Sequence, residues 1–350
     1  MTPEQIEAGS AVSVAVLGAG SWGTTFAKIL ADAAAASGVQ RSVRLWGRRA
    51  EVVEQINTAH RNPQYLKDVE LPHSITASTD VAEVLAGADL VVLAVPAQTL
   101  RLQLREWRHL MSPDALVVSL MKGLELTSDA RMSEVICEEL GIKADRVAVV
   151  SGPNLAMEIA REEPTASVVA CSDAEVAAWI ARSCTAPYFR PYTTTDVVGV
   201  EIGGIVKNVI ALAVGICEGK EMGDNTKASV ITRGLAETSR LALALGGEAR
   251  TMAGLAGLGD LVATCSSPLS RNHTAGRLLG QGLTLEQVTA QMTQTAEGIK
   301  SGQAVNELAG KLGVEMPITA AVVAVLAGKL SVDELGPLLL SRDLKSEGDY

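Results

Sequence analysis

A lysine, Lys207, stands in the middle of the apolar stretch Val197–Gly219, which reads VVGVEIGGIVKNVIALAVGICEG. On a helical period this lysine shares one stripe with three small residues, Gly203, Ala211 and Gly215. Small residues leave room beside the amine for a ligand, or for another backbone to pack closely. Burial disfavours the charged form of an amine, and an amine that titrates nearer neutrality can donate a proton and take it back. Lys207 is therefore a candidate acid–base group.

The same stretch has other interpretations. Its length nearly suits a membrane span, but Glu201, Lys207 and Asn208 are expensive in lipid, so a buried helix is favoured. Within a buried helix, Lys207 either extends its amine to solvent or pairs with Glu201 or another carboxylate. The stretch alone leaves these alternatives open.

A glycine-rich turn near the N-terminus has the spacing of a dinucleotide-binding site. The valine-rich run Ala11–Gly18 predicts a buried parallel strand, and an alanine-rich helix follows the turn. Gly18 permits the tight turn, Gly20 lets the backbone approach a pyrophosphate, and Gly23 lets helix and strand pack closely. The phosphates would then lie at the positive end of the helix. The alternative is a tight glycine turn that binds nothing.

Two arginines follow the next predicted strand, Ser42–Trp46. An enzyme strict for NAD usually carries an acidic residue near this strand end, to hold the ribose 2′-hydroxyl. Here Arg48 and Arg49 stand there, and the first carboxylate is Glu51. Arginine pairs with a 2′-phosphate through its planar fork, so we expect NADP(H) to be accepted and preferred. The alternative is that both arginines are surface charges.

Polar residues and glycines also follow later strands. Buried strands are predicted at Ala88–Val95, Leu116–Leu120 and Val147–Val150. Lys122, Gly152 and Asn154 come just after the last two of these. Ligands on open α/β sheets gather at the carboxyl ends of strands, so these three residues are candidates for substrate contact. An ordinary exposed lysine is the alternative for Lys122.

The strand pattern ends well before the chain does. The polar stretch Asn57–Asp80, with its two prolines, predicts a loop excursion, and two more strands are predicted at Ala166–Ala170 and Tyr188–Pro191. After Asp196 the pattern is helical throughout. We therefore expect an α/β domain with a doubly wound sheet at 1–194, an all-helical domain at 195–342 and a charged tail at 343–350.

The helical half holds two further polar groups. Asp260 lies in the glycine-rich run Ala253–Leu261, where a buried aspartate either caps a helix or orients a polar group. Ser270, Arg271 and Asn272 open another helical pattern, and a hydroxyl, a guanidinium and an amide there suit a phosphate. An N-cap serine followed by an exposed arginine is the alternative.

Composition restricts the class of partner. The chain has 350 residues, 47% of them hydrophobic and 20% charged, which predicts two globular domains with their own cores. A formal net charge of −10 argues against nucleic acid or an anionic membrane as the main partner. The cysteines and histidines form no spacing typical of a disulfide framework or a metal site. The polar, acidic N-terminus is unlike a signal peptide, so we expect a cytoplasmic protein without stable membrane insertion.

Five motifs in this order closely resemble bacterial-type NAD(P)-dependent glycerol-3-phosphate dehydrogenases. They are GAGSWGTTFA at Gly18–Ala27, MKGLE at Met121–Glu125, SGPNLAMEIA at Ser151–Ala160 with PTA after it, GGIVKNVIALAVG at Gly203–Gly215, and GLAGLGDLVATCSSPLSRN at Gly254–Asn272. The last two are the most specific. Together the motifs cover most of the chain.

The resemblance implies a Rossmann-like first domain and a second domain like that of 6-phosphogluconate dehydrogenase. It implies Lys207 as the catalytic proton donor and acceptor between dihydroxyacetone phosphate and sn-glycerol 3-phosphate. Substrate contacts are implied for Lys122, Gly152, Asn154, Lys207, Asp260, Ser270, Arg271 and Asn272. Contacts to NAD(H) or NADP(H) are implied for Ser21, Trp22, Arg48, Arg49, Lys122, Ala156, Arg271, Thr295 and Glu297, beside the glycines 18, 20 and 23.

Two departures and two rival functions accompany this resemblance. The family favours a small residue where this chain has Ile205, which is expected to affect packing and not the site. The family usually has serine where this chain has Asn154, so substrate orientation is expected to differ in detail. The rivals are a related NADP-dependent 2-hydroxyacid dehydrogenase or reductase and a non-catalytic NADPH-binding sensor. Retention of Lys207, Asp260 and Arg271 together argues against the sensor, which needs only the glycine turn. Helices rich in small residues suit close packing and are compatible with a homodimer.

Overall fold

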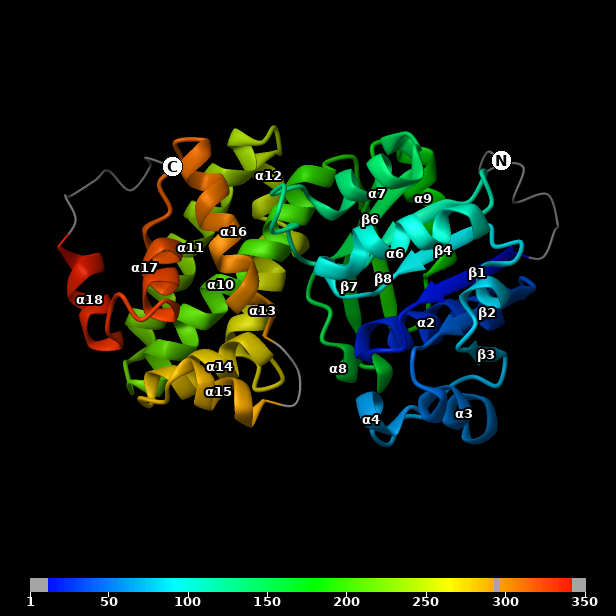
Figure 1. Cartoon of the computed structure of the whole chain (residues 1–350), viewed down its shortest axis with the longest axis horizontal. Coiled ribbons are helices and arrows are strands. Elements are labelled where there is room, and N and C mark those ends of the chain that lie inside the picture. Colours follow the sequence, from blue (N-terminus) through cyan, green and yellow to red (C-terminus); the bar gives the residue numbers. More distant parts are fainter. Residues whose placement is uncertain (1–11, 293–295, 342–350) are drawn as a thin grey trace. The chain divides into compact units, whose positions relative to one another are not determined.

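The computed structural model describes residues 12–292 and 296–341. It divides into two compact units, drawn in Figure 1. The sheet unit comprises Met1–Met121 and Ala130–Val197, and the helical unit comprises Lys122–Asp129 and Val198–Tyr350. The predicted domains 1–194 and 195–342 are each continuous, whereas Lys122–Asp129 leaves the sheet unit and groups with the helices. The predicted tail lies outside the described residues, and the predicted bounds stay a prediction.

The sheet unit is built on eight strands in the order β3-β2-β1-β4-β5-β6-β7-β8. All neighbours are parallel except β6 and β7, which run antiparallel. Central strands such as Leu90–Leu93 are apolar at every position because helices cover both faces of the sheet. The strands are β1 Val12–Leu17, β2 Arg41–Trp46, β3 Ile75–Ser78, β4 Leu90–Leu93, β5 Leu116–Ser119, β6 Val147–Ser151, β7 Thr165–Ala170 and β8 Phe189–Thr194.

The prediction of a loop over Asn57–Asp80 is wrong. Helix α3 (Ala50–Ala59) runs into this stretch, α4 (Pro63–Leu66) begins at a proline, and β3 adds an edge strand beside β2. Only Ile75 of β3 is buried, so no apolar pattern marks the strand in the sequence. Its edge is instead held by the Asn57 amide, which donates to the Ala77 carbonyl at 2.8 Å and accepts from the Ala77 N–H at 2.7 Å.

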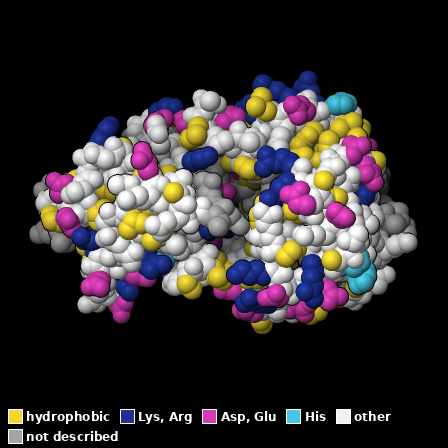
Figure 2. Space-filling model, turned by 60° about the horizontal axis from the view of Figure 1, so that its bottom comes forward, with side chains coloured by type: hydrophobic (Ala, Val, Ile, Leu, Met, Phe, Trp, Pro, Cys, Tyr) yellow, Lys and Arg dark blue, Asp and Glu magenta, His cyan; other side chains and the backbone are white. Residues whose placement is uncertain are grey.

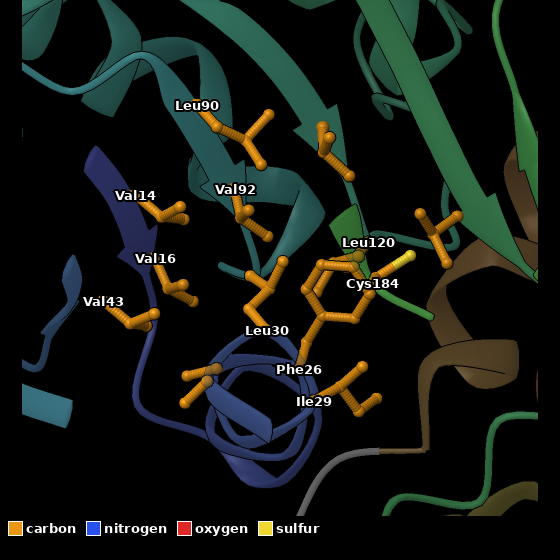
Figure 3. Packing of buried hydrophobic residues seen from close by; sticks show 14 of the residues in the cluster. Val14, Val16, Phe26, Ile29, Leu30, Val43, Leu90, Val92, Leu120 and Cys184 are labelled. Atoms are coloured by element: carbon orange, nitrogen blue, oxygen red, sulfur yellow. The ribbon is translucent and has the colours of Figure 1, made fainter. Parts of the chain in front are cut away.

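Helix α2 (Ser21–Ser37) packs on one face of the sheet. Phe26, Ile29 and Leu30 of this helix are buried against valines and leucines of β1, β2 and β4, as Figure 3 shows. The opposite face is covered by apolar residues of α5, α6 and α7. The remaining helices of this unit are α5 Val81–Leu85, α6 Leu100–Trp107, α7 Met132–Leu140, α8 Ala156–Ala160 and α9 Ala174–Ser183, with single 3-10 turns at Ala97–Thr99, Arg108–Leu110 and Ala144–Arg146.

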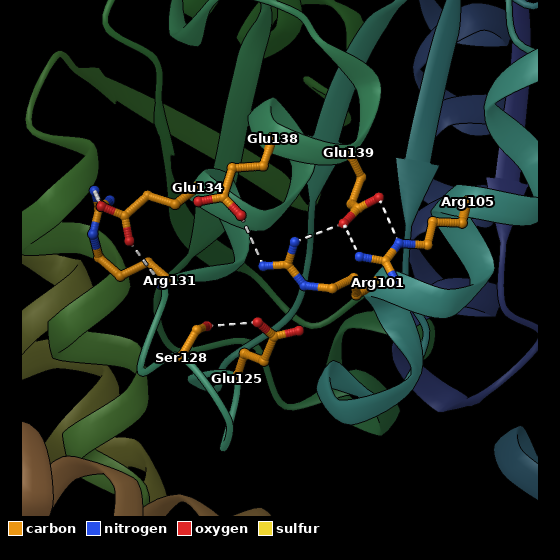
Figure 4. A network of polar contacts seen from close by, with 8 residues as sticks. All are labelled: Arg101, Arg105, Glu125, Ser128, Arg131, Glu134, Glu138 and Glu139. Carbon is orange, nitrogen blue, oxygen red and sulfur yellow. Dashed lines mark hydrogen bonds and ion pairs between the residues drawn. The ribbon is translucent and has the colours of Figure 1, made fainter.

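Ion pairs join α6 to α7 on the outside of the sheet unit. Arg105 binds the Glu139 carboxylate through two nitrogens at 3.0 Å each, and Arg101 binds Glu138 and Glu139 at 2.8 and 2.6 Å (Figure 4). Hydrogen bonds from Arg105 and Arg101 hold the pKa of Glu139 below its ordinary value. This network fixes the two helices to each other.

The helical unit is organised around α10, Val197–Gly219. Among the described residues it is the one helix long and apolar enough to cross a membrane, and 89% of its most apolar window is buried. It is therefore packed as a core helix of this unit. The other helices are α11 Asp224–Ala244, α12 Ala249–Met252, α13 Asp260–Ser266, α14 Arg271–Gly280, α15 Leu285–Gln291, α16 Glu297–Lys311, α17 Pro317–Leu326 and α18 Val332–Leu340, with a π-helical turn at Leu255–Gly259.

The small residues of α10 admit neighbouring backbone. A Cβ atom at Gly215 would overlap the His273 carbonyl oxygen, and one at Gly276 of α14 would overlap the Leu212 carbonyl oxygen of α10. A Cβ atom at Gly203 would lie 2.5 Å from the Ala256 carbonyl oxygen. Of the two uses predicted for the small-residue stripe, close backbone packing is the one that the structure contains at these glycines.

Candidate active site

Two lysine side chains of the helical unit meet at the Asp260 carboxylate. The Lys207 Nζ lies 2.9 Å from Asp260 Oδ1, and the Lys122 Nζ lies 2.6 Å from Asp260 Oδ2. Lys207 also donates a hydrogen bond of 2.6 Å to the Thr264 hydroxyl, which lies 3.2 Å from Asp260 Oδ1. All four side chains are buried or nearly so, and two cations around one anion leave the cluster with a positive balance.

Local structure explains how these groups come together. The close approach of the π-helical turn to α10 at Gly203 brings the start of α13 beside the lysine one turn further along α10. Asp260 is the first residue of α13, and Thr264 lies one turn later on the same face. Lys122 arrives from the segment Lys122–Asp129, which leaves the sheet after β5 and joins the helical unit.

Burial sets the titration of this cluster. Burial lowers the pKa of Lys122 to about 8. The negative charge of Asp260 opposes this lowering, and the positive charge of Lys207 adds to it. Burial alone would raise the pKa of Asp260, but the charges of Lys122 and Lys207 and their hydrogen bonds outweigh it and hold this pKa below its ordinary value. Asp260 therefore stays ionised, and Lys122 titrates near physiological pH.

The start of α14 carries the predicted phosphate grip. Ser270 is its N-cap and accepts a hydrogen bond of 3.2 Å from the His273 N–H. Arg271 is exposed and follows directly. Asn272 is buried, donates to Asn208 Oδ1 on α10 at 2.9 Å and accepts from the Gly298 N–H on α16 at 2.9 Å. Asn272 thus ties the N-termini of α14 and α16 to α10, one residue from Lys207.

The beginning of α16 holds another of the predicted residues. Glu297 is its first residue and is exposed, and its charge raises the pKa of Lys122 slightly against the effect of burial. Thr295 lies outside the described residues. Asn208, the residue after Lys207 on α10, donates its amide nitrogen to the Gly204 carbonyl at 3.4 Å and accepts from Asn272 with its oxygen.

In the sheet unit, the glycine-rich turn has the form that a phosphate cradle requires. Gly18 has φ +127°, and a Cβ atom there would overlap the Ala94 carbonyl oxygen. A Cβ atom at Gly23 would overlap the carbonyl oxygen of Gly18, so helix and strand touch at this point. At Gly20 nothing lies within 4 Å of a built Cβ atom, which leaves open space before the first turn of α2. Ser21 is the first residue of that turn.

Trp22 presents a buried donor beside the turn. Its ring packs edge-on to Phe26, with 5.6 Å between ring centroids. Its Nε1 atom is buried, and no atom of the described residues accepts a hydrogen bond from it. A buried indole N–H usually has an acceptor, so this donor marks a place that a polar ligand atom would satisfy.

The two arginines after β2 lie beside the glycine turn. A Cβ atom at Gly47 would be 3.0 Å from the Ala19 Cβ, so the residue before Arg48 abuts the turn. Arg48 is exposed. Arg49 donates a hydrogen bond of 2.9 Å to the Tyr65 hydroxyl and lies 5.4 Å from the centroid of its ring. Tyr65 therefore orients Arg49, one of the two residues predicted to bind the 2′-phosphate.

Three predicted residues follow β6 in the sheet unit. Gly152 has φ +138°, a conformation that other residues adopt at a cost. Both amide atoms of Asn154 are buried and have no hydrogen-bond partner in the described part of the chain. Ala156 begins α8, and its carbonyl accepts a hydrogen bond of 3.1 Å from Thr25 of α2. The structure thus connects Ala156 to the helix that follows the glycine turn, and leaves the Asn154 amide available for a ligand.

Two residues of the site were missed in the sequence. Thr264 links Lys207 to Asp260, and its position four residues after Asp260 in a helical pattern is the signal that would have found it. Tyr65 was missed because it falls in the stretch interpreted as a loop. No group of three histidine, cysteine, aspartate or glutamate side chains suited to a metal ion occurs in the described residues.

A glycine-rich nucleotide turn on a doubly wound sheet, followed by a buried lysine–aspartate cluster in a helical unit, defines a nicotinamide-dependent oxidoreductase. Residues 13–177 match the family described as NAD-dependent glycerol-3-phosphate dehydrogenase N-terminus, and residues 196–336 match its C-terminus. The chain belongs to the NAD-dependent glycerol-3-phosphate dehydrogenase family.

Individual relatives agree with this assignment. Glycerol-3-phosphate dehydrogenase [NAD(P)+] of Thermobifida fusca is 58% identical over 334 residues, covering 95% of this chain and 98% of the relative. The protein of the same name from Streptomyces griseus is 58% identical and covers 96% and 98%. The crystal structure of glycerol-3-phosphate dehydrogenase from Coxiella burnetii has a TM-score of 0.88 at 35% identity, covering 95% of this chain and 99% of that one. These relatives support neither the 2-hydroxyacid reductase nor the sensor.

Proposed function

We propose that this protein transfers hydride reversibly between dihydroxyacetone phosphate and sn-glycerol 3-phosphate, with NADPH or NADH as the partner. The observation that carries the proposal is the cluster of Lys207 and Lys122 around Asp260, in a chain of this family. A product of this kind supplies the backbone of phospholipids. The substrate is a small phosphorylated molecule.

The sheet unit fits a dinucleotide. The open space at Gly20, the close contacts at Gly18 and Gly23, and the unpaired N–H of Trp22 fit a pyrophosphate bound at the first turn of α2. The nicotinamide, when bound, supplies or accepts the hydride. The chain's own task is to hold the dinucleotide through this turn, Ser21 and Ala156.

Cofactor preference is proposed to rest on Arg48 and Arg49. Both arginines follow β2 beside the glycine turn. No acidic residue stands between the end of β2 and Glu51 to hold a ribose 2′-hydroxyl. Arg49 is held by Tyr65, so its guanidinium is ordered before a 2′-phosphate arrives. On this basis NADPH is preferred over NADH.

The substrate phosphate is proposed to bind at the start of α14. The exposed guanidinium of Arg271 suits a phosphate, and the hydroxyl hydrogen of Ser270 remains a donor because its oxygen accepts from His273. The positive end of α14 adds to both. Asn272 holds this end in place through Asn208 and Gly298.

Lys207 is proposed to exchange the proton of the reacting oxygen. An ammonium carries three hydrogens, and Lys207 directs two of them to Thr264 and Asp260, which leaves one for the substrate. As negative charge develops on the ketone oxygen, this amine stabilises it and gives it a proton; in the reverse direction it takes the proton back. Asp260 keeps the amine oriented, and Lys122 adds a second positive charge.

The remaining predicted contacts are proposed on the family resemblance. Gly152 and Asn154 are proposed to contact the substrate, and the unpartnered amide of Asn154 supports this. Glu297 and Thr295 are proposed to contact the dinucleotide, together with Lys122 and Arg271.

We place the protein in the cytoplasm, without stable membrane insertion. All five cysteines lie in the described residues, and none forms a disulfide, as expected in a reducing compartment. Nucleic acid is not proposed as a partner, because the net charge is −10 and the face in Figure 2 shows both signs of charge interspersed. A homodimer stays a prediction from the sequence, because the small residues at Gly203, Gly215 and Gly276 pack against backbone of the same chain.

The reaction is tested by the absorbance of reduced nicotinamide. Purified protein is mixed with dihydroxyacetone phosphate and either NADPH or NADH, and with 2-keto acids as a comparison. Rapid oxidation with the phosphorylated ketone alone supports the proposal. Oxidation with the keto acids alone indicates a 2-hydroxyacid reductase, and nucleotide binding without any oxidation indicates the sensor.

A further inference from the structure

Asn62 is a buried asparagine whose side chain reaches the glycine-rich turn. It has no solvent exposure, and its Nδ2 donates to the Ala19 carbonyl oxygen at 3.1 Å and to the Thr24 hydroxyl at 2.9 Å. Ala19 lies between the first two glycines of the turn, and Thr24 lies in the first turns of α2. One amide therefore fastens both sides of the turn.

Two observations show that the Asn62 side chain bonds the glycine-rich turn in place of the contacts that an asparagine at this position usually makes. Asn62 occupies the N-cap position of α4, where an asparagine side chain usually accepts from the backbone of its own helix, yet it makes no such bond. Its Oδ1 is buried and has no hydrogen-bond partner among the described residues, which costs free energy. The amide orientation is fixed by chemistry, because the Ala19 carbonyl only accepts.

The contact controls the orientation of one peptide plane. The Ala19 carbonyl and the Gly20 N–H belong to the same planar peptide and point in opposite directions. With the carbonyl held toward Asn62, the Gly20 N–H points away from it. A Cβ atom at Gly20 would meet nothing within 4 Å, so open space lies beside this residue, where a phosphate oxygen has room to approach.

We propose that Asn62 is a positioning residue for dinucleotide binding, which locks the glycine-rich turn with the Gly20 N–H presented to the pyrophosphate. The inference rests on the proposed function. The pyrophosphate is common to both cofactors, so Asn62 acts on NADPH and NADH alike, in contrast to Arg48 and Arg49.

The test compares Asn62→Ala and the isosteric Asn62→Asp with wild type. Neither an alanine nor a carboxylate donates to the Ala19 carbonyl, so the Kd values of NADPH and NADH are expected to rise about tenfold in both variants. The KM for each cofactor rises likewise, while kcat at saturating cofactor and the KM for dihydroxyacetone phosphate stay within about twofold. Thr24→Val, which removes one of the two acceptors, is expected to have a smaller effect of the same kind.

The matched control is Asp89→Ala. Asp89 accepts a hydrogen bond of 2.9 Å from the Ser13 N–H, at the opposite ends of the strands from the glycine turn. Asp89→Ala is expected to lower thermal stability without a change in cofactor Kd, because this hydrogen bond is lost far from the turn. The inference would be overturned if the cofactor Kd of Asn62→Ala is unchanged. It would also be overturned if Asp89→Ala, at an equal loss of thermal stability, raises the cofactor Kd as much as Asn62→Ala does. A wild-type protein that binds neither nucleotide would instead overturn the proposed function.

Discussion

Lys207 and Asp260 form an ion pair of 2.9 Å in which the side chains are 10% and 2% exposed. A buried charge without a partner is costly, so each residue holds the other in place. Thr264 and Lys122 complete the arrangement on the two oxygens of Asp260. The pair thus fixes the lysine amine in one orientation, which a proton transfer to a single oxygen atom requires.

Substrate affinity should depend on the protonation of Lys122. Burial lowers its pKa from 10.5 to about 8, so the amine is charged below pH 8 and loses its proton above it. If its charge attracts the anionic substrate, the KM for dihydroxyacetone phosphate should rise above pH 8, by up to about tenfold per pH unit. Steady-state kinetics across this range measure the effect. Lys122→Arg, which stays protonated, should give a flat profile; equal slopes in the two proteins would remove Lys122 from substrate binding.

Cofactor preference should depend on the two arginines. Replacing Arg48 and Arg49 together by alanine removes the groups proposed to pair with the 2′-phosphate. The Kd of NADPH should rise about tenfold or more, while that of NADH changes little, because NADH lacks this phosphate. Fluorescence titration with both nucleotides provides the comparison. An equal loss for both would mean that the arginines do not distinguish the cofactors.

Close backbone packing between α10 and α14 should be intolerant of a single methyl group. Gly276→Ala places a Cβ atom onto the Leu212 carbonyl oxygen and should destabilise the protein by roughly 1–3 kcal/mol or more. Gly310→Ala is the matched control, because this glycine is exposed in α16 and its Cβ would meet nothing within 4 Å. It should stabilise by about 0.5–1 kcal/mol through helix propensity. Urea denaturation measures both, and equal effects would contradict the packing described.

A buried carboxylate in the helical unit should make stability depend on pH. Glu237 accepts hydrogen bonds from the Ile318 N–H at 2.6 Å and from the N–H and hydroxyl of Thr319 at 3.2 Å each, at the start of α17. Burial raises its pKa from 4.5 to about 7. Because the folded state holds this proton more tightly, the associated stability is present below pH 4.5 and is lost as pH rises through 7.

The variant Glu237→Gln isolates this contribution. It does not ionise, and its one carbonyl oxygen keeps the acceptor for either Ile318 or Thr319. Between about pH 5 and 8 the free energy of unfolding of wild type should fall, relative to the variant, by up to about 3 kcal/mol. Parallel pH profiles for the two proteins would show that Glu237 does not titrate in this range.

Most of the sheet and the helical half follow from local pattern. Strands such as Leu90–Leu93 are apolar throughout because both faces of the sheet are covered, and α10 is apolar because it is the core of its unit. Strand β3 was missed because one buried residue, Ile75, is too little pattern to distinguish an edge strand from a loop. Its pairing with β2 is a tertiary contact that composition does not encode.

The site, too, could be predicted from the sequence only in part. The residue types of Lys207, Asp260 and Lys122 indicated chemistry, but their meeting depends on the π-helical turn against Gly203 and on the segment after β5 that joins the helical unit. The small-residue stripe of α10 had two interpretations in the sequence, and only the position of neighbouring carbonyl groups distinguishes them. Thr264 was missed because a threonine within a helix is usually unremarkable until its neighbours are known.

The most direct test of the account is the turnover number of Lys207→Ala beside that of wild type, measured with saturating NADPH and dihydroxyacetone phosphate. The NADPH Kd of the same preparation shows that the glycine turn is intact. We predict a fall in kcat of about 10²–10⁴-fold with an unchanged NADPH Kd, because the proton donor is lost and the dinucleotide site is not. An unchanged kcat would contradict the account by removing Lys207 from the mechanism.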